Sequence, residues 1–560
     1  MESGFVLSHF PRNSMILDSD LEVPSAAPVD VSRSPYLSTF SRFRAPFVLL
    51  LLFCIVLLLQ VASGAYHAEF GGYADPPAHY VTSLMLREYV LGPAPLSPIE
   101  FARNYYHHYP KVALGHWPPV LYVVQGLWMT LFSPSRVSVL LELALTTTLL
   151  AYAVYAEARR WFGSRPAILA ALLTVCLPLV QTYTDEEMAE TLLTLFCFLS
   201  TISFIRYLDT GRWTHSVWFG IFCSLAILTK GSGWLLAMIP PIAIVLTRKF
   251  RLLTRPSFWL SVPIVAILCL PWQFATLGLA ERGWEGGTQP NLAYTISALG
   301  QFGLILFEVA GSVLGVLALI GLISMVLAPM FRKPVAAAPA AMAALIASVW
   351  IFHSLVPAGV EDRKMLLAVP AVVLFIFAGG LWIAAHIQLG PRLNRWRSTA
   401  ILAVTAACFF LQAFFIPHAP HYGYAEAARF ITSKPELSHT VMLASSGSIG
   451  EGLLISEVAM CRPRPTDTII RASKVLALVD WNGSHYQAFY SNPAQILSEL
   501  DHRHIDAVVV DTFSAQSKWP HVKLVKQTIQ QNPSRFHLLA TFPSGDPAAP
   551  GNVQVYRLTP

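Results

Sequence analysis

Charged and polar side chains that could do chemistry occur at four places in a mostly apolar sequence. The first place is a long segment that contains Asp75, His79 and His116. The other three are an acidic run containing Asp185 and Glu190, a lysine that ends an apolar stretch, Lys230, and the pair Arg363 and Lys364. A carboxylate can accept a hydroxyl proton during attack, and cations can hold a phosphate leaving group. The combination suits a reaction between a lipid-borne phosphoester and a polar acceptor.

Each place also has a simpler interpretation. Asp75 precedes two prolines, and Asp before a proline at the first helical position is a common helix start. The acidic run 185–190 could be a solvated loop, and Lys230 could extend to the outer headgroups. Glu190, however, lies within an apolar stretch, where a charge costs about 2.5–3.5 kcal/mol at mid-span. We therefore expect Glu190 to face a polar cavity.

The composition indicates that much of the protein surface faces lipid. Of 560 residues, 54% are hydrophobic and only 12% are charged, whereas about 25% are charged in an average soluble domain. The net charge of +6 is attributed to cytoplasmic loops, so nucleic-acid binding is not expected. The seven cysteines form no CxxC pair, which argues against a zinc site or a disulfide framework.

Apolar runs predict a polytopic α-helical membrane protein of about eleven transmembrane helices, because a span needs about 20 residues. The runs are 46–64, 137–156, 166–183, 189–206, 215–229, 233–247, 257–273, 308–328, 337–355, 366–386 and 398–416. The shorter run 118–133 is interpreted as a re-entrant or interfacial helix on the outer face. Residues 1–45 are expected to be a disordered cytoplasmic N-terminus, and 65–136 a long first outer loop.

The distribution of basic residues orients this layout in a cell (inner) membrane. Sixteen basic residues occupy the loops assigned to the inside: Arg42, Arg44, Arg159, Arg160, Arg165, Arg206, Arg212, Arg248, Lys249, Arg251, Arg255, Arg332, Lys333, Arg392, Arg395 and Arg397. Four occupy the short outer loops: Lys230, Arg282, Arg363 and Lys364. Basic residues favour the cytoplasmic side, so the C-terminal region is predicted to lie outside the cytoplasm.

Residues 418–560 are predicted to form an extracytoplasmic α/β domain. Buried strands are expected at Val441-Met-Leu-Ala, Ala507-Val-Val-Val and Leu538-Leu-Ala-Thr, with amphipathic helices at 493–502 and 519–532 between them. Gly447-Ser-Ile-Gly-Glu-Gly follows the first strand. It does not match GxGxxG, so an ordinary strand-to-helix turn is favoured over a phosphate-binding turn.

The pattern resembles the polyprenyl-phosphate-sugar-dependent glycosyltransferases of the C-type membrane fold, which include protein O-mannosyltransferases and aminoarabinose transferases. The resemblance covers roughly 46–390. It depends on the order of five short features: Asp75, His116-Trp-Pro-Pro, Ala158-Arg-Arg-Trp-Phe, Glu190 and Leu228-Thr-Lys-Gly. Each feature is short, and their order and spacing together are fairly specific.

The resemblance implies roles for several residues. Asp75 matches the family's first-loop acid, the catalytic base, and Glu190 matches its second-loop acid. The family often has a second acid after the first, and Pro76 occupies that position here. Trp117 occupies the place of a lysine in some members, so a phosphate would be bound by other cations. The substrate-binding candidates are His79, His116, Lys230, Arg363 and Lys364.

The expected function is an inverting hexosyl- or pentosyltransferase that uses a polyprenyl-phosphate sugar and a glycan, lipid or protein acceptor. A divalent metal is left open, with Glu190 and Asp185 as candidate ligands. The first alternative is a lipid or sugar transporter or flippase, but transporters place polar residues near the midplane and contain repeats. The second is an assembly protein whose C-terminal domain is the working part, in which case the first outer loop would be dispensable.

Overall fold

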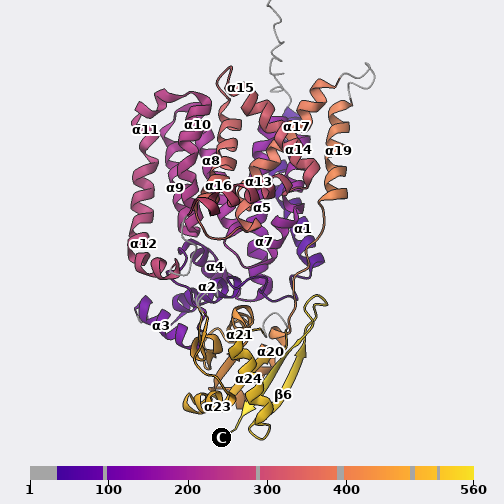
Figure 1. The fold of residues 1–560 in the computed structure, drawn as a ribbon. Coiled ribbons are helices and arrows are strands. Elements are labelled where there is room, and N and C mark those ends of the chain that lie inside the picture. Colours follow the sequence, from indigo (N-terminus) through magenta and orange to yellow (C-terminus); the bar gives the residue numbers. More distant parts are fainter. Residues whose placement is uncertain are drawn as a thin grey trace, which may run out of the picture. The chain divides into compact units, whose positions relative to one another are not determined.

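The computed structural model describes residues 35–92, 97–284, 291–387, 396–479, 486–513 and 518–559. Residues 48–560 form one compact unit, and residues 1–47 form a separate one. Most of the predicted disordered N-terminus, residues 1–34, lies outside the described residues. The description below concerns the larger unit (Figure 1).

Seven helical segments in the described part are long and apolar enough to cross a membrane. They are Ala45–Ser63 in α1, α5 (Arg136–Phe162), α8 (Glu190–Thr210), Pro256–Gly278 in α11 and α12, Ser312–Met330 from α14 to α15, α16 (Ala337–Leu355) and Asp362–His386 in η4 and α17. An eighth is reached if α6 (Ser164–Cys176) and α7 (Pro178–Asp185), bent by 57°, form one broken span. The protein is therefore largely helical and multi-pass.

The predicted count of eleven spans is not confirmed. The predicted spans 215–229, 233–247 and 398–416 correspond to shorter apolar helices, α9 (Trp213–Thr229), η1 with α10 (Gly231–Thr247) and α19 (Arg397–Gln412). The chain between α9 and α10 tightens into the 3-10 helix η1 (Gly231–Met238), which divides the apolar stretch. A further apolar helix, α13 (Leu292–Glu308), was not predicted.

The other helical elements of this part have the following bounds. They are η2 (Phe250–Thr254), α11 (Pro256–Trp259), α12 (Ser261–Trp284), α14 (Ser312–Leu322), the π-helix η3 (Ile323–Leu327), α15 (Ala328–Met330), η4 (Asp362–Ala368) and α17 (Val369–His386). The helices α14 and α17 cross at two glycines. A side chain on Gly321 would collide with the Phe375 carbonyl, and one on Gly379 with the Leu317 carbonyl. Small residues allow this close approach, as is common between membrane helices.

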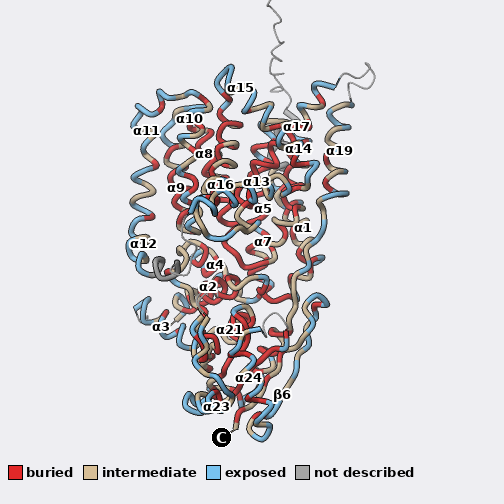
Figure 2. Tube along the Cα trace, in the orientation of Figure 1, coloured by how far each residue is buried: buried red, intermediate tan, exposed pale blue. Residues whose placement is uncertain are grey.

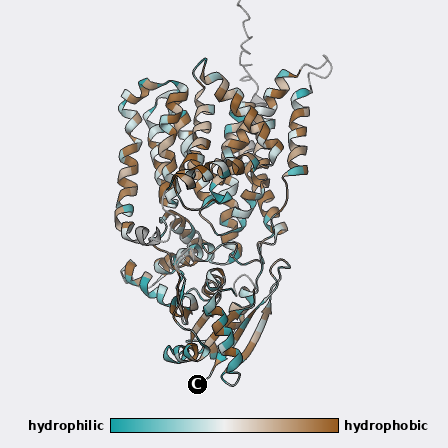
Figure 3. Ribbon diagram, viewed as in Figure 1, coloured by the Kyte–Doolittle hydropathy of each residue, from teal (hydrophilic) through white to brown (hydrophobic). Residues whose placement is uncertain are grey.

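The span 256–278 has an apolar surface that faces outward. Only 11% of the most apolar 18 residues of this span are buried inside the structure. Figure 2 shows that α12 is largely exposed. Figure 3 shows hydrophobic residues along the same helix. Exposed apolar side chains include Ile267 and Phe274, which is expected of a helix that faces lipid.

The first outer loop contains three helices, α2 (Pro76–Leu91), α3 (Pro98–His108) and α4 (Val120–Leu131). The 12-residue helix α4 lies within the predicted interfacial run 118–133. The helix α2 packs between α4 and α21 (Ser448–Cys461), and residues 76–85 are all buried.

The C-terminal part contains a five-stranded mixed sheet in the order β2-β1-β5-β7-β6. Its strands are β1 (Val441–Ser445), β2 (Thr468–Arg471), β5 (Ala507–Asp511), β6 (Phe536–Pro543) and β7 (Asn552–Leu558). Both β2 and β5 run parallel to β1, whereas β7 runs antiparallel to β5 and β6. The three predicted strands are present as β1, β5 and β6, and the two predicted helices as α23 (Pro493–His502) and α24 (Pro520–Gln531). The expected burial is confirmed for β1 and β5 but is wrong for Leu538-Leu-Ala-Thr, because β6 is an edge strand and Leu538 and Leu539 are exposed.

The remaining C-terminal elements are α20 (Tyr424–Ser433), η5 (Pro435–Leu437), α22 (Ala472–Val475) and the short pair β3 (Ala477–Leu478) and β4 (Gln487–Ala488). One apolar core joins the C-terminal part to the first outer loop, with Tyr80 and Leu84 packed among residues such as Leu453. Arg136 also forms an ion pair with Glu457 of α21. The C-terminal part and the first outer loop are therefore one packed body.

Candidate functional site

The side chain of Asp75 binds a cation and does not cap its helix. Asp75 occupies the N-cap position of α2, but its side chain makes no capping hydrogen bond. Its backbone carbonyl accepts the hydrogen bonds from Ala78 and His79. The carboxylate Oδ2 instead accepts a hydrogen bond from Arg363 Nη1 at 3.0 Å. The simple helix-cap interpretation of Asp75 is therefore wrong.

Arg363 lies at the centre of a cluster of carboxylates. Its Nε donates to Glu361 Oε2 at 2.7 Å and lies 3.7 Å from Glu190 Oε1. The guanidinium also stacks over the Tyr73 ring, 5.2 Å from its centroid. Because the guanidinium is a planar fork with several donors, it can bind several oxygens at once. One side chain from η4 thus joins the first outer loop to the start of α8.

Glu190 and Lys230 form the second half of this network. The helix α8 begins at Glu190, and α9 ends immediately before Lys230, so both side chains project from helix ends. Lys230 Nζ lies 2.5 Å from Glu190 Oε1. The other oxygen, Oε2, is buried without a hydrogen-bond partner among the described residues. A buried carboxylate oxygen without a partner is costly, so this oxygen is available to a ligand hydroxyl.

The charges around Asp75 keep it ionised. Burial favours the neutral form, but His79, Arg363 and Lys230 together lower the pKa of Asp75 below its ordinary value. Burial lowers the pKa of His79 to about 4, so this imidazole is neutral at neutral pH. At neutral pH the lowered pKa of Asp75 is therefore caused by the positive charges of Arg363 and Lys230. His79 Nδ1 lies 3.2 Å from the Tyr122 hydroxyl, and its ring contacts Trp117 at 4.5 Å.

The acidic run 185–190 is not a solvated loop, contrary to the alternative interpretation. Glu186, Glu187 and Glu190 are all buried. Glu186 Oε1 accepts a hydrogen bond from the Gly72 backbone at 2.8 Å. Burial raises the pKa of Glu186 to about 8 and that of Glu187 well above its ordinary value. Glu186 is therefore mostly protonated at neutral pH, whereas Glu190 pairs with Lys230 and Arg363.

The structure brings Asp75, Glu190, Lys230 and Arg363 together and places the other candidates around them. Lys364 Nζ donates to the Ala358 and Gly359 carbonyls at 2.6 Å and lies 3.9 Å from Glu361. His116 lines a separate cavity beside the start of α2, together with Ala74 and Ala78. Lys364 therefore reaches the network at Glu361, while burial lowers the pKa of His116 and the charge of Asp75 opposes that shift.

Glu190, one of the two metal ligands that the sequence leaves open, is occupied by Lys230 and Arg363. The other candidate, Asp185, lies at the end of α7. Two cations already neutralise the carboxylates at Asp75 and Glu190, so this donor set does not fit a divalent cation.

Another group in the described part does have the donor types of a metal site. Glu69, His421 and Glu426 place ligand atoms within 4.8 Å of one another. The carboxylate of Glu69 also accepts hydrogen bonds from the backbone of Tyr422, Gly423 and Ala425. This contact attaches the C-terminal part to the first outer loop.

Sequence reasoning missed several residues of the site and its surroundings. Tyr73 and Glu361 each lie two positions before a predicted site residue, Asp75 and Arg363. That closeness in the chain could have indicated that they belong to the site. Lys111 and Glu69 lie in the first outer loop, but Lys111 lines a cavity together with residues of the C-terminal part, and Glu69 contacts His421. No spacing in the sequence relates those segments, because tertiary packing alone brings them together.

Comparisons with known proteins support the fold. Residues 116–274 match the family described as dolichyl-phosphate-mannose-protein mannosyltransferase. No curated protein matches the chain. The crystal structure of ArnT from Cupriavidus metallidurans in the apo state matches with a TM-score of 0.54 and 13% identity, over 90% of this chain and 97% of that chain. The same protein bound to undecaprenyl phosphate matches with a TM-score of 0.51 and 14% identity, over the same shares of the two chains.

An oligosaccharyltransferase from Archaeoglobus fulgidus, in complex with Zn and sulfate, is also similar. It matches with a TM-score of 0.55 and 14% identity, over 91% of this chain and 73% of that chain. At these identities the likeness concerns the fold. Together, the matches confirm the resemblance to the C-type fold of polyprenyl-phosphate-sugar glycosyltransferases.

Proposed function

We propose, from the C-type fold and the ion-pair network, that this chain is a membrane glycosyltransferase. It transfers a sugar from a polyprenyl-phosphate donor to an acceptor outside the cytoplasm and inverts the anomeric centre. The observation that carries the proposal is the partly buried network in which Arg363 contacts Asp75, Glu190 and Glu361. It places a candidate base beside cations that suit a phosphate leaving group.

The leaving phosphate would be stabilised by Arg363 and Lys230, because fixed cations lower the energy of charge that develops on a leaving oxygen. Lys230 is the more accessible of the two, with 21% of its side chain exposed against 13% for Arg363. When a phosphate draws Arg363 away, the carboxylate of Asp75 loses a partner and its pKa rises. A carboxylate with a higher pKa is a stronger base for the acceptor hydroxyl.

The direct test is the reaction itself. Purified protein is incubated with polyprenyl-phosphate sugars, and the release of free polyprenyl phosphate is measured. Release that depends on an acceptor fraction supports the proposal. Movement of intact donor across vesicle membranes without release would instead identify a transporter.

Lys230→Ala should weaken donor binding about tenfold or more, because a charge-assisted contact to phosphate contributes about 1.5–3 kcal/mol. Binding of undecaprenyl phosphate to the purified protein measures this directly. Lys333→Ala is the matched control, since Lys333 is an exposed lysine on a loop assigned to the cytoplasm. Unchanged affinity in Lys230→Ala would assign Lys230 a purely structural role as the partner of Glu190.

The C-terminal part is proposed to lie outside the cytoplasm. A reporter that is active only outside the cytoplasm should be active when fused after Pro560, because basic residues of the short loops favour the opposite side. The same reporter inserted after Lys333 is the control and should be inactive. The reverse pattern would invert the layout and place Asp75 on the cytoplasmic side, since the first outer loop and the C-terminal part pack together.

A further inference from the structure

Three side chains with metal-binding donor atoms meet where the chain passes from α19 into the C-terminal part. Glu69 belongs to the first outer loop, His421 to the segment between α19 and α20, and Glu426 to the first turn of α20. One donor atom from each residue lies within 4.8 Å of the other two. The His421 ring contacts both carboxylates, with Nδ1 at 3.3 Å from Glu69 Oε2 and Nε2 at 3.5 Å from Glu426 Oε2. Imidazole nitrogens and carboxylate oxygens are ordinary ligands of zinc in proteins.

The carboxylate of Glu69 is held in one orientation by the backbone. Its Oε2 accepts a hydrogen bond from the Tyr422 amide at 2.7 Å. Its Oε1 accepts hydrogen bonds from the Gly423 and Ala425 amides at 2.9 and 3.1 Å. Each carboxylate oxygen offers two acceptor positions, so Oε2 has one position left for a metal ion. Hydrogen bonds of this kind orient a carboxylate that binds a metal.

The His421 ring is also fixed in place. A side chain on Gly545, in the turn between β6 and β7, would lie 2.5 Å from His421 Cδ2, so this glycine makes room for the ring. The His421 carbonyl accepts hydrogen bonds from the Gly545 and Asp546 amides at 3.0 and 3.2 Å. The Ser544 hydroxyl donates to the same oxygen at 2.9 Å. These contacts position His421 without using either ring nitrogen.

The group is negatively charged and incompletely paired. Glu69 is 2% exposed and forms no ion pair with a lysine or an arginine in the described part of the chain. Among the same residues, His421 Nδ1 and Glu426 Oε2 are buried without a hydrogen-bond partner. A buried carboxylate needs a positive partner, and buried polar atoms without partners are costly. A divalent cation between the three side chains supplies both needs.

We infer that Glu69, His421 and Glu426 bind one Zn²⁺ ion, with water completing the coordination. Ligand atoms of a tetrahedral zinc site with bonds of about 2.0 Å lie about 3.3 Å apart, which matches the contact between His421 Nδ1 and Glu69 Oε2. Glu426 is partly exposed and can rotate toward the ion. A ring nitrogen favours zinc over Mg²⁺ and Ca²⁺, which prefer oxygen ligands alone.

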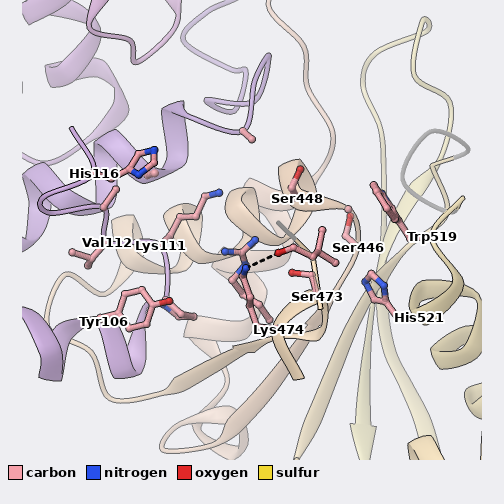
Figure 4. A pocket seen from close by; sticks show the side chains of 17 residues that line it. Tyr106, Lys111, Val112, His116, Ser446, Ser448, Ser473, Lys474, Trp519 and His521 are labelled. Atoms are coloured by element: carbon pink, nitrogen blue, oxygen red, sulfur yellow. Dashed lines mark hydrogen bonds between the residues drawn. The ribbon is translucent and has the colours of Figure 1, made fainter. Parts of the chain in front are cut away.

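The role of this ion is structural. Its ligands come from the first outer loop and from both the segment before α20 and α20 itself, so the ion fastens the C-terminal part to the first outer loop. None of the three ligands lines the cavity into which Lys111, His116 and His521 point (Figure 4). The inference therefore does not rest on the proposed transferase function.

The first test measures Zn²⁺ binding by calorimetry to the metal-free, full-length protein without an affinity tag. One Zn²⁺ ion per chain is expected, with much weaker binding of Ca²⁺. Glu426→Gln and His421→Gln should each weaken Zn²⁺ binding at least about tenfold to hundredfold, the loss that even an outer-shell partner causes. Glu499→Gln is the matched control, because Glu499 pairs with Arg503 on a C-terminal helix as Glu426 pairs with Arg429. Equal Zn²⁺ affinities in wild type and Glu426→Gln would overturn the inference.

A thiol is the other candidate for zinc in this part of the chain. Cys461 is free and exposed, and thiolates bind zinc. Cys461→Ser should keep one Zn²⁺ ion per chain at wild-type affinity. Loss of binding in Cys461→Ser, with normal binding in His421→Gln, would assign the ion to the thiol and overturn the inference.

A second measurement locates the ion. Zn²⁺ should slow hydrogen exchange of the Tyr422, Gly423 and Ala425 amides, because these amides bind Glu69 and exchange only when that contact opens. Zn²⁺ should also raise the melting temperature, since it binds the folded state. Both effects should disappear in Glu426→Gln. Zn²⁺ binding that leaves the exchange of these amides unchanged would place the ion elsewhere and overturn the inference.

An ion pair of a protonated imidazole gives a different pattern. If His421 only pairs with the two carboxylates as a cation, His421→Gln lowers the melting temperature equally with and without Zn²⁺. Zn²⁺ then leaves the melting temperature of the wild type unchanged. That result would overturn the metal site, whereas a Zn²⁺-dependent difference between wild type and His421→Gln supports it.

Discussion

Asp75→Asn should leave the protein folded and inserted but lower turnover by at least about a hundredfold, because a general base contributes about 10²–10⁴-fold. The substitution removes the basic oxygen with little change in size. Arg363 would still contact Glu361 at 2.7 Å and Glu190 at 3.7 Å, so the network keeps two of its three carboxylates. Turnover is measured as release of polyprenyl phosphate at saturating donor.

The matched control for this substitution is Asp501→Asn. Asp501 also pairs with an arginine, Arg535, at 2.7 Å, but it lies in the C-terminal part and is half-exposed. It should keep wild-type turnover. A further comparison with Asp75→Ala separates chemistry from folding, because the Asp75 side chain makes no capping hydrogen bond. Normal turnover in Asp75→Asn would place the base elsewhere.

Glu190→Gln should lower turnover about tenfold to hundredfold while expression stays intact. The carboxylate oxygen Oε2 is buried without a hydrogen-bond partner in the described part of the chain, and a hydrogen bond from an acceptor hydroxyl to a charged group contributes about 1.5–3 kcal/mol. Gln keeps the shape and an acceptor for Lys230 but loses the charge. Because the positive charges of Lys230 and Arg363 are then less neutralised by residue 190, undecaprenyl phosphate should bind at least as tightly as it does to the wild type.

A suitable control is Glu157→Gln, which also removes a buried carboxylate from a membrane helix. Glu157 lies 3.2 Å from Arg206 and accepts a hydrogen bond from Trp161. Its loss should affect thermal stability without affecting turnover. If both variants lower turnover equally, the effect of Glu190→Gln is caused by weaker packing of the membrane helices and not by the loss of a contact in the site.

The combination of these variants distinguishes the roles within the network. Lys230→Ala should reduce donor affinity, Glu190→Gln should reduce turnover at unchanged or tighter donor binding, and Asp75→Asn should reduce turnover the most. A network that only stabilises the fold would give parallel losses of thermal stability and activity in all three variants. Contacts of 2.5–3.7 Å join the cations Lys230 and Arg363 to the carboxylates Asp75 and Glu190, so double variants of these residues should not be additive.

The sequence by itself determined that the protein is a membrane protein, that Glu190 needs polar neighbours, and where strands lie in the C-terminal part. Each of these depends on local pattern: apolar runs reach the length of a bilayer, a charge within such a run is costly, and buried strands are continuously apolar. The family resemblance also identified Asp75 and Lys230. The number of spans was less certain, because the breaks at Lys230 and between α6 and α7 divide apolar runs without changing their composition.

Only the tertiary structure decided which charges meet. Asp75 and Arg363 are 288 positions apart and form an ion pair, while Asp75 leaves its own helix uncapped. Glu190 pairs with Lys230, which is 40 positions away in the chain. Lys111 and Arg471 share a cavity because the C-terminal part packs on the first outer loop. Side-chain pairing depends on how distant segments pack, and neither hydropathy nor spacing records that packing.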